Sequence, residues 1–279
     1  MLINLAGRVA LITGGSRGIG YSIAEALAKE GANFLLASRT LAELETAKSN
    51  LEKYGGVIEI CQADVSKKDD VFKIGVLLKD KFKNQVDILV NAAGVYGPIG
   101  PLAENDPDEW KKALDINLFG TFLMIRAIAP LMKKLDRGKI INFVGGGEGA
   151  YPNFTSYVAA KGGVARLTET VAAELKSFHI DVNAIAPGAV NTKFLDDLLK
   201  AGSSKVGQET YERSLKQKEN GGVSPQKAAK LAVFLVSNLS DGLSGKIISA
   251  VRDDYHKFPK QLKEIMESDA YTLRRVKPS

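Results

Sequence analysis

Short apolar runs alternate along this chain with longer amphipathic segments, and this alternation limits the possible folds more than any other feature. The apolar runs predict strands at residues 9–13, 34–38, 57–62, 88–91, 139–144, 181–186 and 246–250. Helical spacing occupies residues 19–30, 41–54, 68–82, 108–135, 156–178 and 225–237. Continuous apolar strands separated by helices form parallel sheets that are covered on both faces, with right-handed crossovers. We therefore expect an α/β fold with a doubly wound parallel sheet of about seven strands and helices on both faces.

The chain has 279 residues and no internal repeat or low-complexity linker, so we expect one domain. We place this domain at residues 1–251 and a C-terminal tail extension at residues 252–279, where residues 259–267 have helical spacing. Residues 187–224 also fall outside the alternation. Long irregular excursions of this kind are usually lids or binding loops.

Composition excludes several classes of protein. With one cysteine, Cys61, and two histidines, His179 and His256, we expect neither a disulfide nor a zinc cluster, and no other metal site is predicted. No apolar run reaches the roughly 18 residues of a membrane span, and no basic segment precedes the first apolar stretch. We therefore expect a cytoplasmic protein with no membrane partner.

The net charge is 38 − 32 = +6, and the basic residues are dispersed beside acidic ones. Nucleic-acid binders concentrate their basic residues, so we predict no nucleic-acid partner. A mild positive excess suits an anionic small molecule.

The first predicted strand ends in TGGSRGIG, residues 13–20. Glycines at 14, 18 and 20 permit a tight turn and a close approach of the backbone to a pyrophosphate, at the positive end of the following helix. A P-loop would need Gly-Lys-Ser/Thr, which does not occur here. The loop therefore predicts a Rossmann-type dinucleotide site rather than an ATP site.

The second predicted strand ends at Ser38 and Arg39. An acidic residue at this place holds a free ribose 2′-hydroxyl, whereas an arginine meets a 2′-phosphate. Because the acid is missing, we expect Arg39 and Arg17 to flank a phosphate. This favours NADP(H) over NAD(H).

Tyr157 and Lys161 lie four residues apart in YVAAK, on one face of a predicted helix. An ammonium beside a phenol lowers the phenol pKa from about 10 toward neutrality. The pair is suited to general acid–base catalysis on a carbonyl–alcohol couple.

In order along the chain, TGGSRGIG, Asp64-Val65, NAAG at 91–94, Asn117, YVAAK and APG at 186–188 resemble the short-chain dehydrogenase/reductase family. The spacing TGxxxGxG is similar to that of its short single-domain reductases, and the resemblance runs from about residue 7 to 248. It implies an NADP(H)-dependent enzyme that interconverts a carbonyl and a secondary alcohol. It also implies a homodimer or homotetramer that associates through helices 108–135 and 156–178.

The resemblance assigns a role to each matching residue. Asp64 would hold the adenine amino group, Asn117 would anchor a water that relays protons to Lys161, and Thr192 would bind the carboxamide or phosphates. The expected catalytic residues are Tyr157, Lys161, Asn117 and Gly145. The expected cofactor-binding residues are Gly14, Ser16, Arg17, Gly18, Ile19, Gly20, Ser38, Arg39, Asp64, Val65, Asn91, Ala92, Gly94, Tyr157, Lys161, Pro187, Gly188, Val190 and Thr192.

One expected residue is missing, because the family's catalytic serine would fall on Val144 or Gly145. In one account, backbone N–H groups of glycines 145–147 replace the hydroxyl, or the glycines make room for a larger substrate. In the other account, the protein binds NADP(H) without catalysing a reaction, as a sensor or partner subunit. We favour the first account because Tyr157, Lys161 and Asn117 are all present; Thr155, Ser156 and Glu148 are weaker candidates for the donor.

The expected walls of the substrate site are residues 95–101, 145–152 and 189–222. Lysines 193, 200, 205 and 216 in the last segment favour a polar or negatively charged substrate. We hypothesise that the tail covers the substrate cleft or a neighbouring subunit.

Overall fold

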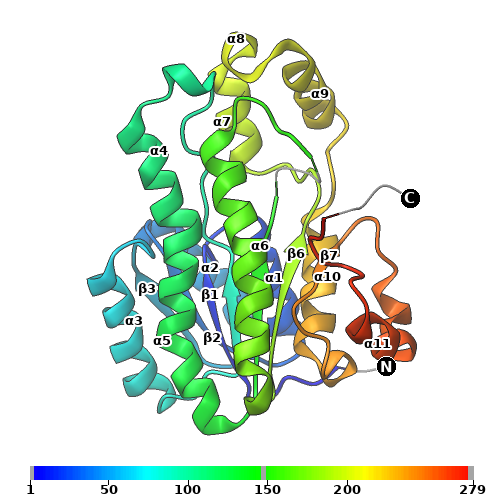
Figure 1. The fold of residues 1–279 in the computed structure, drawn as a ribbon. Helices are drawn as coiled ribbons and strands as arrows, with labels where there is room; N and C mark the ends of the chain where they lie inside the picture. The colour runs from blue at the N-terminus through cyan, green and yellow to red at the C-terminus, as the bar shows by residue number, and fades with distance from the viewer. Residues whose placement is uncertain (1–2, 146–148, 276–279) are drawn as a thin grey trace.

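A single parallel sheet forms the centre of the molecule (Figure 1). The structure is a computed structural model that describes residues 3–145 and 149–275. Within these residues the strand order is β3-β2-β1-β4-β5-β6-β7. The strands are β1 (Val9–Thr13), β2 (Asn33–Ser38), β3 (Ile58–Gln62), β4 (Ile88–Asn91), β5 (Gly138–Phe143), β6 (Ile180–Ala186) and β7 (Ile247–Ser249). The Rossmann-type doubly wound fold is therefore confirmed.

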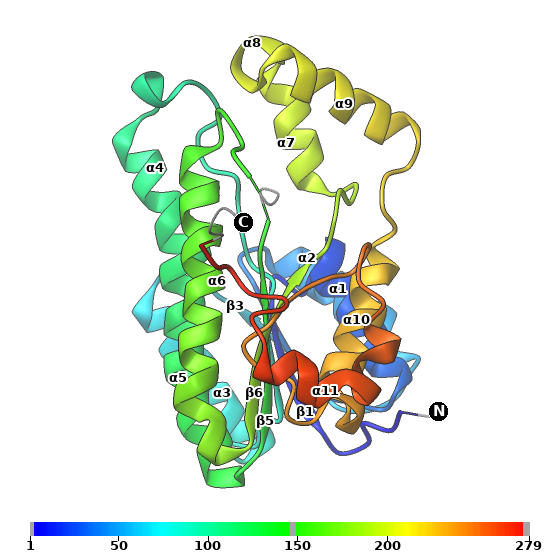
Figure 2. The same cartoon turned by 45° about the vertical axis from the view of Figure 1, so that its right-hand side comes forward.

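Helices cover both faces of the sheet, as Figures 1 and 2 show. One face carries α1 (Gly18–Lys29), α2 (Leu41–Glu52) and α10 (Pro225–Val236), and the other carries α3 (Lys68–Phe82), α5 (Gly120–Leu135) and α6 (Thr155–Leu175). The alternation of side chains along each strand supplies both cores. In β1, Ala10 and Ile12 pack toward α1 and α10, whereas Val9 and Leu11 pack toward α3 and α5.

The predicted helix at residues 108–135 is continuous but not uniform. It comprises α4 (Pro107–Leu114), the π-helical turn η2 (Asp115–Phe119) and α5. By length and composition this helix could cross a membrane, but half of its most apolar 18-residue stretch is buried inside the protein. Its apolar residues Met124 and Ile128 are fully buried in the core beside β4 and β5, which accounts for that composition.

Residues 187–224, predicted as an irregular excursion, contain three helices: α7 (Lys193–Ala201), α8 (Ser203–Val206) and α9 (Gln208–Glu219). We call residues 193–219 the lid, because they lie above the carboxyl edge of the sheet in Figures 1 and 2. Leu198 and Val206 are buried against Phe154, while the charged residues of the lid are exposed to solvent. Because charged residues separate the few apolar ones, the sequence pattern did not predict these helices.

The tail packs onto the domain along the edge strand β7. Helix α11 (Phe258–Glu267) buries Phe258 and Ile265 in the core next to α10, close to the predicted 259–267. The backbone N–H of Ile247 donates to the Tyr271 carbonyl at 2.7 Å, and the buried Lys246 ammonium donates to the carbonyls of Ser268 and Ala270. The contacts of the described tail therefore cover the edge strand β7 rather than the surroundings of Tyr157.

Candidate active site

The carboxyl ends of the strands bring the predicted site residues to one edge of the sheet, the upper edge in Figure 1. Strand order reverses between β1 and β4, and ligands of doubly wound sheets bind at such a switch point. The glycine loop follows β1, Ser38 ends β2, residues 92–94 follow β4, Gly145 follows β5, and Pro187 follows β6.

The glycine loop forms a cradle that side chains would fill. Gly14 and Gly18 have φ angles of +64° and +57°, in the left-handed region that favours glycine. A Cβ atom on Gly14 would lie 2.8 Å from the Ala93 nitrogen, and one on Gly20 would overlap the Gly14 carbonyl. Helix α1 begins at Gly18 without a side-chain cap, which leaves N–H groups at its positive end. The cradle fits a pyrophosphate.

Ser38 and Arg39 lie where the 2′-position of a bound ribose is expected. The Ser38 hydroxyl is buried and has no hydrogen-bond partner within the described chain, which fits a ligand oxygen. Arg39 has no ion pair with the described residues and lines a groove of about 510 Å³ together with Tyr96 and Lys200.

Arg17, in contrast, is held by a residue that the sequence did not single out. Its Nη1 atom lies 2.7 Å from Oε1 of Glu43, and the Ser16 hydroxyl donates to Oε2 of the same carboxylate at 3.1 Å. The sequence signal for Glu43 was an acid in the first turn of α2. Arg17 is thus paired with Glu43, whereas Arg39 has no such partner among the described residues.

On the adenosine side, the side chains are fixed by local contacts. Oδ1 of Asp64 accepts hydrogen bonds from the Ser66 N–H and hydroxyl, and the Val65 side chain packs against Gly120 in the core. Nδ2 of Asn91 donates to Asn142, whereas its Oδ1 is buried without a partner in the described residues.

The segment after β6 returns to the glycine loop. Gly188 has a φ of +81°, and Val190 forms a parallel bridge with Val223. Thr192 precedes α7, and its Cγ2 atom lies 3.5 Å from the position of a Cβ on Gly18. Thr192 therefore lies beside the glycine loop, and its cofactor role stays a prediction.

Tyr157 and Lys161 lie one turn apart on α6. Lys161 is 6% exposed; its Nζ atom donates to the Phe143 carbonyl at 3.0 Å and lies 5.9 Å from the centre of the Tyr157 ring. Burial lowers the pKa of Lys161 to about 8 and raises the pKa of the Tyr157 phenol. This direction is opposite to the lowering expected from the ammonium, and burial of the phenol is its largest cause. The phenol therefore keeps its proton at neutral pH.

Asn117 lies in the π-helical turn, fully buried. Its Oδ1 accepts from the Val95 N–H at 3.1 Å, and its Nδ2 donates to the carbonyls of Val95 and Ala113 at 2.8 Å. A Cβ on Gly94 would lie 2.7 Å from this Oδ1 and 3.8 Å from Nζ of Lys161. The structure thus brings Asn117, Gly94 and Lys161 together, and the relay water stays a prediction.

Gly145, one of the two candidate positions of the missing serine, lies against Tyr157. A Cβ atom on Gly145 would overlap the Tyr157 hydroxyl oxygen and come within 3.1 Å of its Cζ atom. The Tyr157 hydroxyl can lie here only because residue 145 has no side chain. The other donor candidates Gly146, Gly147 and Glu148 fall outside the described residues.

Aromatic rings surround Tyr157, a feature that the sequence analysis missed. The Tyr96 ring meets the Tyr157 ring edge-on at 5.0 Å and the Phe194 ring at 4.8 Å, and Phe194 lies 6.0 Å from Tyr157. The clustering of Tyr151, Phe154 and Tyr157 in the sequence could have indicated such a wall. Lysines 193, 200, 205 and 216 are exposed, while the wall near Tyr157 is apolar.

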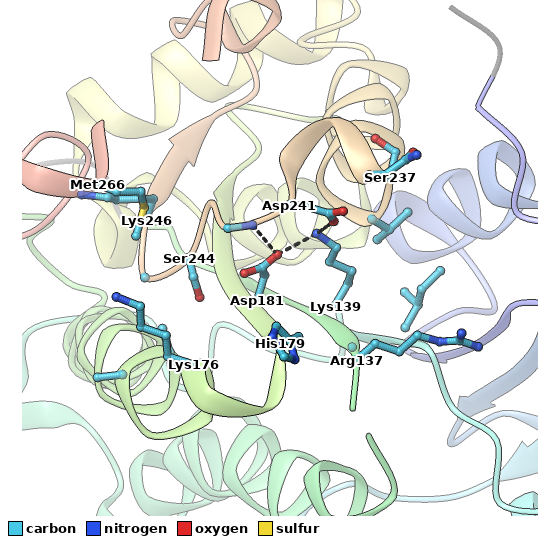
Figure 3. A pocket seen from close by; sticks show the side chains of 18 of the residues that line it. Arg137, Lys139, Lys176, His179, Asp181, Ser237, Asp241, Ser244, Lys246 and Met266 are labelled. Atoms are coloured by element: carbon cyan, nitrogen blue, oxygen red, sulfur yellow. Dashed lines mark hydrogen bonds and ion pairs between the residues drawn. The ribbon is translucent and has the colours of Figure 1, made fainter. Parts of the chain in front are cut away.

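A cavity of about 1000 Å³ lies at the opposite edge of the sheet (Figure 3). At its centre, Nζ of Lys139 lies 2.7 Å from carboxylate oxygens of both Asp181 and Asp241. These charged groups are paired with one another, and Tyr157 and Lys161 lie at the opposite, carboxyl edge of the sheet. Within the described part of the chain, no group of three or more His, Cys, Asp or Glu residues could hold a metal ion.

Comparisons with known proteins agree with this geometry. Residues 8–202 match the family described as short chain dehydrogenase. The chain is 38% identical over 198 residues to a 3-oxoacyl-[acyl-carrier-protein] reductase of Synechocystis, covering 70% of this chain and 78% of that protein. It is 34% identical over 248 residues to a diacetyl reductase of Staphylococcus epidermidis, covering 86% and 96%. An NAD⁺-bound xylitol dehydrogenase structure is similar with a TM-score of 0.80 and 25% identity, covering 88% of this chain and 98% of that one.

Proposed function

The chain belongs to the short-chain dehydrogenase/reductase family, an oxidoreductase family that binds a nicotinamide cofactor, and from this premise we propose that it is an NADP(H)-dependent enzyme interconverting a carbonyl compound and a secondary alcohol. The observation that carries the proposal is the pair formed on α6 by the half-buried Tyr157 and the buried Lys161, next to Gly94 and Gly145. NADPH oxidation in the presence of ketones, aldehydes and keto-sugars tests it.

The described residues fit the cofactor along the whole edge of the sheet. The glycine loop and the start of α1 would hold the pyrophosphate, Asp64 and residues 91–94 the adenosine, and Thr192 the phosphates or carboxamide. Pro187, Gly188 and Val190 would line the nicotinamide side. When bound, the cofactor supplies or accepts the hydride.

The side chains on α6 handle the proton. Tyr157 donates its proton to the carbonyl oxygen during reduction and removes it during oxidation. The Lys161 ammonium stabilises the phenolate that remains and binds the ribose hydroxyls. Asn117 holds the loop that carries Gly94 and Val95, and Gly145 gives the Tyr157 hydroxyl its place.

Arg39→Ala should weaken NADPH binding about 10- to 100-fold, the loss expected for one hydrogen-bonded charge pair, and leave NADH binding nearly unchanged. The basis is that Arg39 has no competing ion pair within the described residues, whereas Arg17 is bound to Glu43. Titrations of both nucleotides by fluorescence measure the effect, with NADH as the internal control. An equal loss for both nucleotides would refute the 2′-phosphate assignment.

The pH dependence of carbonyl reduction should report Lys161. Its pKa of about 8 means that the ammonium is present below pH 8 and is lost as the pH rises through this value. We expect kcat/KM to fall about tenfold per pH unit above pH 8. The residual activity of the Lys161→Met variant should not show this decrease in kcat/KM above pH 8. A wild-type profile that stays level well above pH 8 would contradict the role of the ammonium.

For assembly and location, we propose a cytoplasmic homodimer or homotetramer joined through α5 and α6, with no membrane or nucleic-acid partner. On α5, Phe122 is 41% exposed and stacks with Phe119 at 5.8 Å, which supports an apolar contact face there. Light scattering of the purified protein distinguishes these states from a monomer.

The second candidate is a non-catalytic NADP(H)-binding protein. The glycine at the serine position favours it, because removal of one preorganised donor costs about 10²- to 10³-fold in rate. Both candidates bind the cofactor, so turnover rather than binding separates them.

A further inference from the structure

Three segments of the chain meet where the 2′-position of a bound ribose is expected. The glycine loop follows β1, Ser38 ends the neighbouring strand β2, and α2 begins at Leu41. A hydrogen bond of 2.8 Å from the Gly14 N–H to the Ala37 carbonyl joins the loop to β2. Charged groups on the loop, after β2 and in the first turn of α2 therefore act on the same part of a dinucleotide.

The carboxylate of Glu43 connects α2 to the glycine loop. Its Oε1 atom lies 2.7 Å from Nη1 of Arg17, and its Oε2 atom accepts a hydrogen bond of 3.1 Å from the Ser16 hydroxyl. Glu43 lies in the first turn of α2, where the positive end of a helix stabilises an anion. Both oxygens are thus engaged, and together these contacts fix a negative charge beside the loop.

The groups near this carboxylate differ in their freedom to meet a ligand. The Ser38 hydroxyl is buried without a partner in the described chain, and Arg39 has no ion pair with the described residues. Arg17 differs from both, because its guanidinium is already paired with Glu43. A phosphate that approaches Arg17 therefore competes with a carboxylate for the same cation.

The two nicotinamide dinucleotides differ in charge at this place. A ribose 2′-hydroxyl is neutral and can donate a hydrogen bond to a carboxylate, whereas a 2′-phosphate is an anion that a carboxylate repels. A repulsive group of this kind changes the ratio of two affinities even where it adds no new contact. The charge of Glu43 thus acts against one cofactor and not the other.

We propose that Glu43 is a cofactor-selectivity residue: its carboxylate pairs with Arg17 and opposes the 2′-phosphate, so that it limits the preference for NADPH over NADH. This inference rests on the proposed placement of the cofactor along this edge of the sheet. The contacts of Glu43 are with the glycine loop, so its effect is on cofactor binding rather than on proton transfer at Tyr157.

Glu43→Gln removes the negative charge and keeps the size of the side chain. The Kd of NADPH should fall about three- to tenfold, the size expected of charge interactions at a partly exposed site, and the Kd of NADH should stay within about twofold. Fluorescence titrations of both nucleotides at low ionic strength, where such interactions are least screened, measure the two constants. The control is Glu45→Gln, which makes the same change in net charge at an exposed position of α2 and should change both constants less than about twofold.

A double variant tests whether the effect passes through Arg17. Arg17→Ala alone leaves Glu43 unpaired and should weaken NADPH binding about three- to tenfold. Arg17→Ala combined with Glu43→Gln removes both charges of the pair, so the Kd of NADPH should return to within about twofold of wild type. NADH titrations of the same variants show that each one is folded.

The outcomes separate the role of Glu43 from the proposed cofactor preference. Equal changes in both nucleotides for Glu43→Gln, or NADPH binding no tighter than in wild type, overturn the role of Glu43 whichever nucleotide the wild type prefers. A double variant that keeps the full gain overturns the pairing with Arg17 as its basis. A wild type that binds NADH more tightly than NADPH overturns the proposed NADP(H) preference, while a shift of Glu43→Gln toward NADPH still supports the selectivity role.

Discussion

Tyr157→Phe should lower the rate of carbonyl reduction by about 10²- to 10⁴-fold, the usual contribution of a general acid. Burial keeps the Tyr157 phenol protonated, and its ring is held by Tyr96 and Phe194, so the variant loses the proton without losing the packing. The Kd of NADPH should change little, because Lys161 and the glycine loop remain. Initial rates of NADPH oxidation, combined with nucleotide titration, measure both quantities.

The control is Tyr54→Phe, which removes a hydroxyl that donates to Glu25 of α1. Tyr54 and α1 lie on the opposite face of the sheet from α6, the helix that carries Tyr157. The Tyr54→Phe variant should leave kcat within about twofold of wild type. Full activity in Tyr157→Phe would contradict the assigned mechanism, since no other group in the proposal supplies the proton.

Gly145→Ser should lower kcat by at least about tenfold instead of restoring a lost serine. Its Cβ would overlap the Tyr157 hydroxyl oxygen, and the ring cannot retreat freely because Tyr96 and Phe194 lie against it. A displacement of the acid by even about 1 Å is costly to the rate. Steady-state kinetics with saturating NADPH measure the change.

The control is Gly75→Ser on α3, away from Tyr157 and outside the proposed α5–α6 contact face. A Cβ at Gly75 would meet nothing within 4 Å, so kcat should be unchanged. A large gain in kcat for Gly145→Ser would show that the enzyme lacks a donor at this position, against the account in which glycine makes room for Tyr157.

The fold could be predicted closely because most segments have the residue spacing either of a buried strand or of an amphipathic helix. Strand β1 at Val9–Thr13 and helix α3 at Lys68–Phe82 have the predicted bounds, since buried strands and amphipathic helices differ strongly in spacing. The helices of the lid were missed because they are short and highly charged, and their apolar residues Leu198 and Val206 only become informative once Phe154 is placed beside them.

The motif residues of the site were predictable, whereas their partners were not. Spacing placed Tyr157 beside Lys161, but only the fold shows that Glu43 holds Arg17 and that Gly145 touches the Tyr157 hydroxyl. The direction of the Tyr157 pKa also depends on burial by residues that are far away in sequence, such as Tyr96 and Phe194. Spacing along one helix carries no information on that desolvation.

The most direct test of the central claim is the NADPH-dependent reduction of a panel of ketones, aldehydes and keto-sugars by the wild-type protein, with detection of the alcohol product. We expect NADPH oxidation and alcohol formation in equal amounts with at least one member of the panel, and loss of both in Tyr157→Phe. Tight NADPH binding without alcohol formation from any member would contradict the account and would support the non-catalytic alternative.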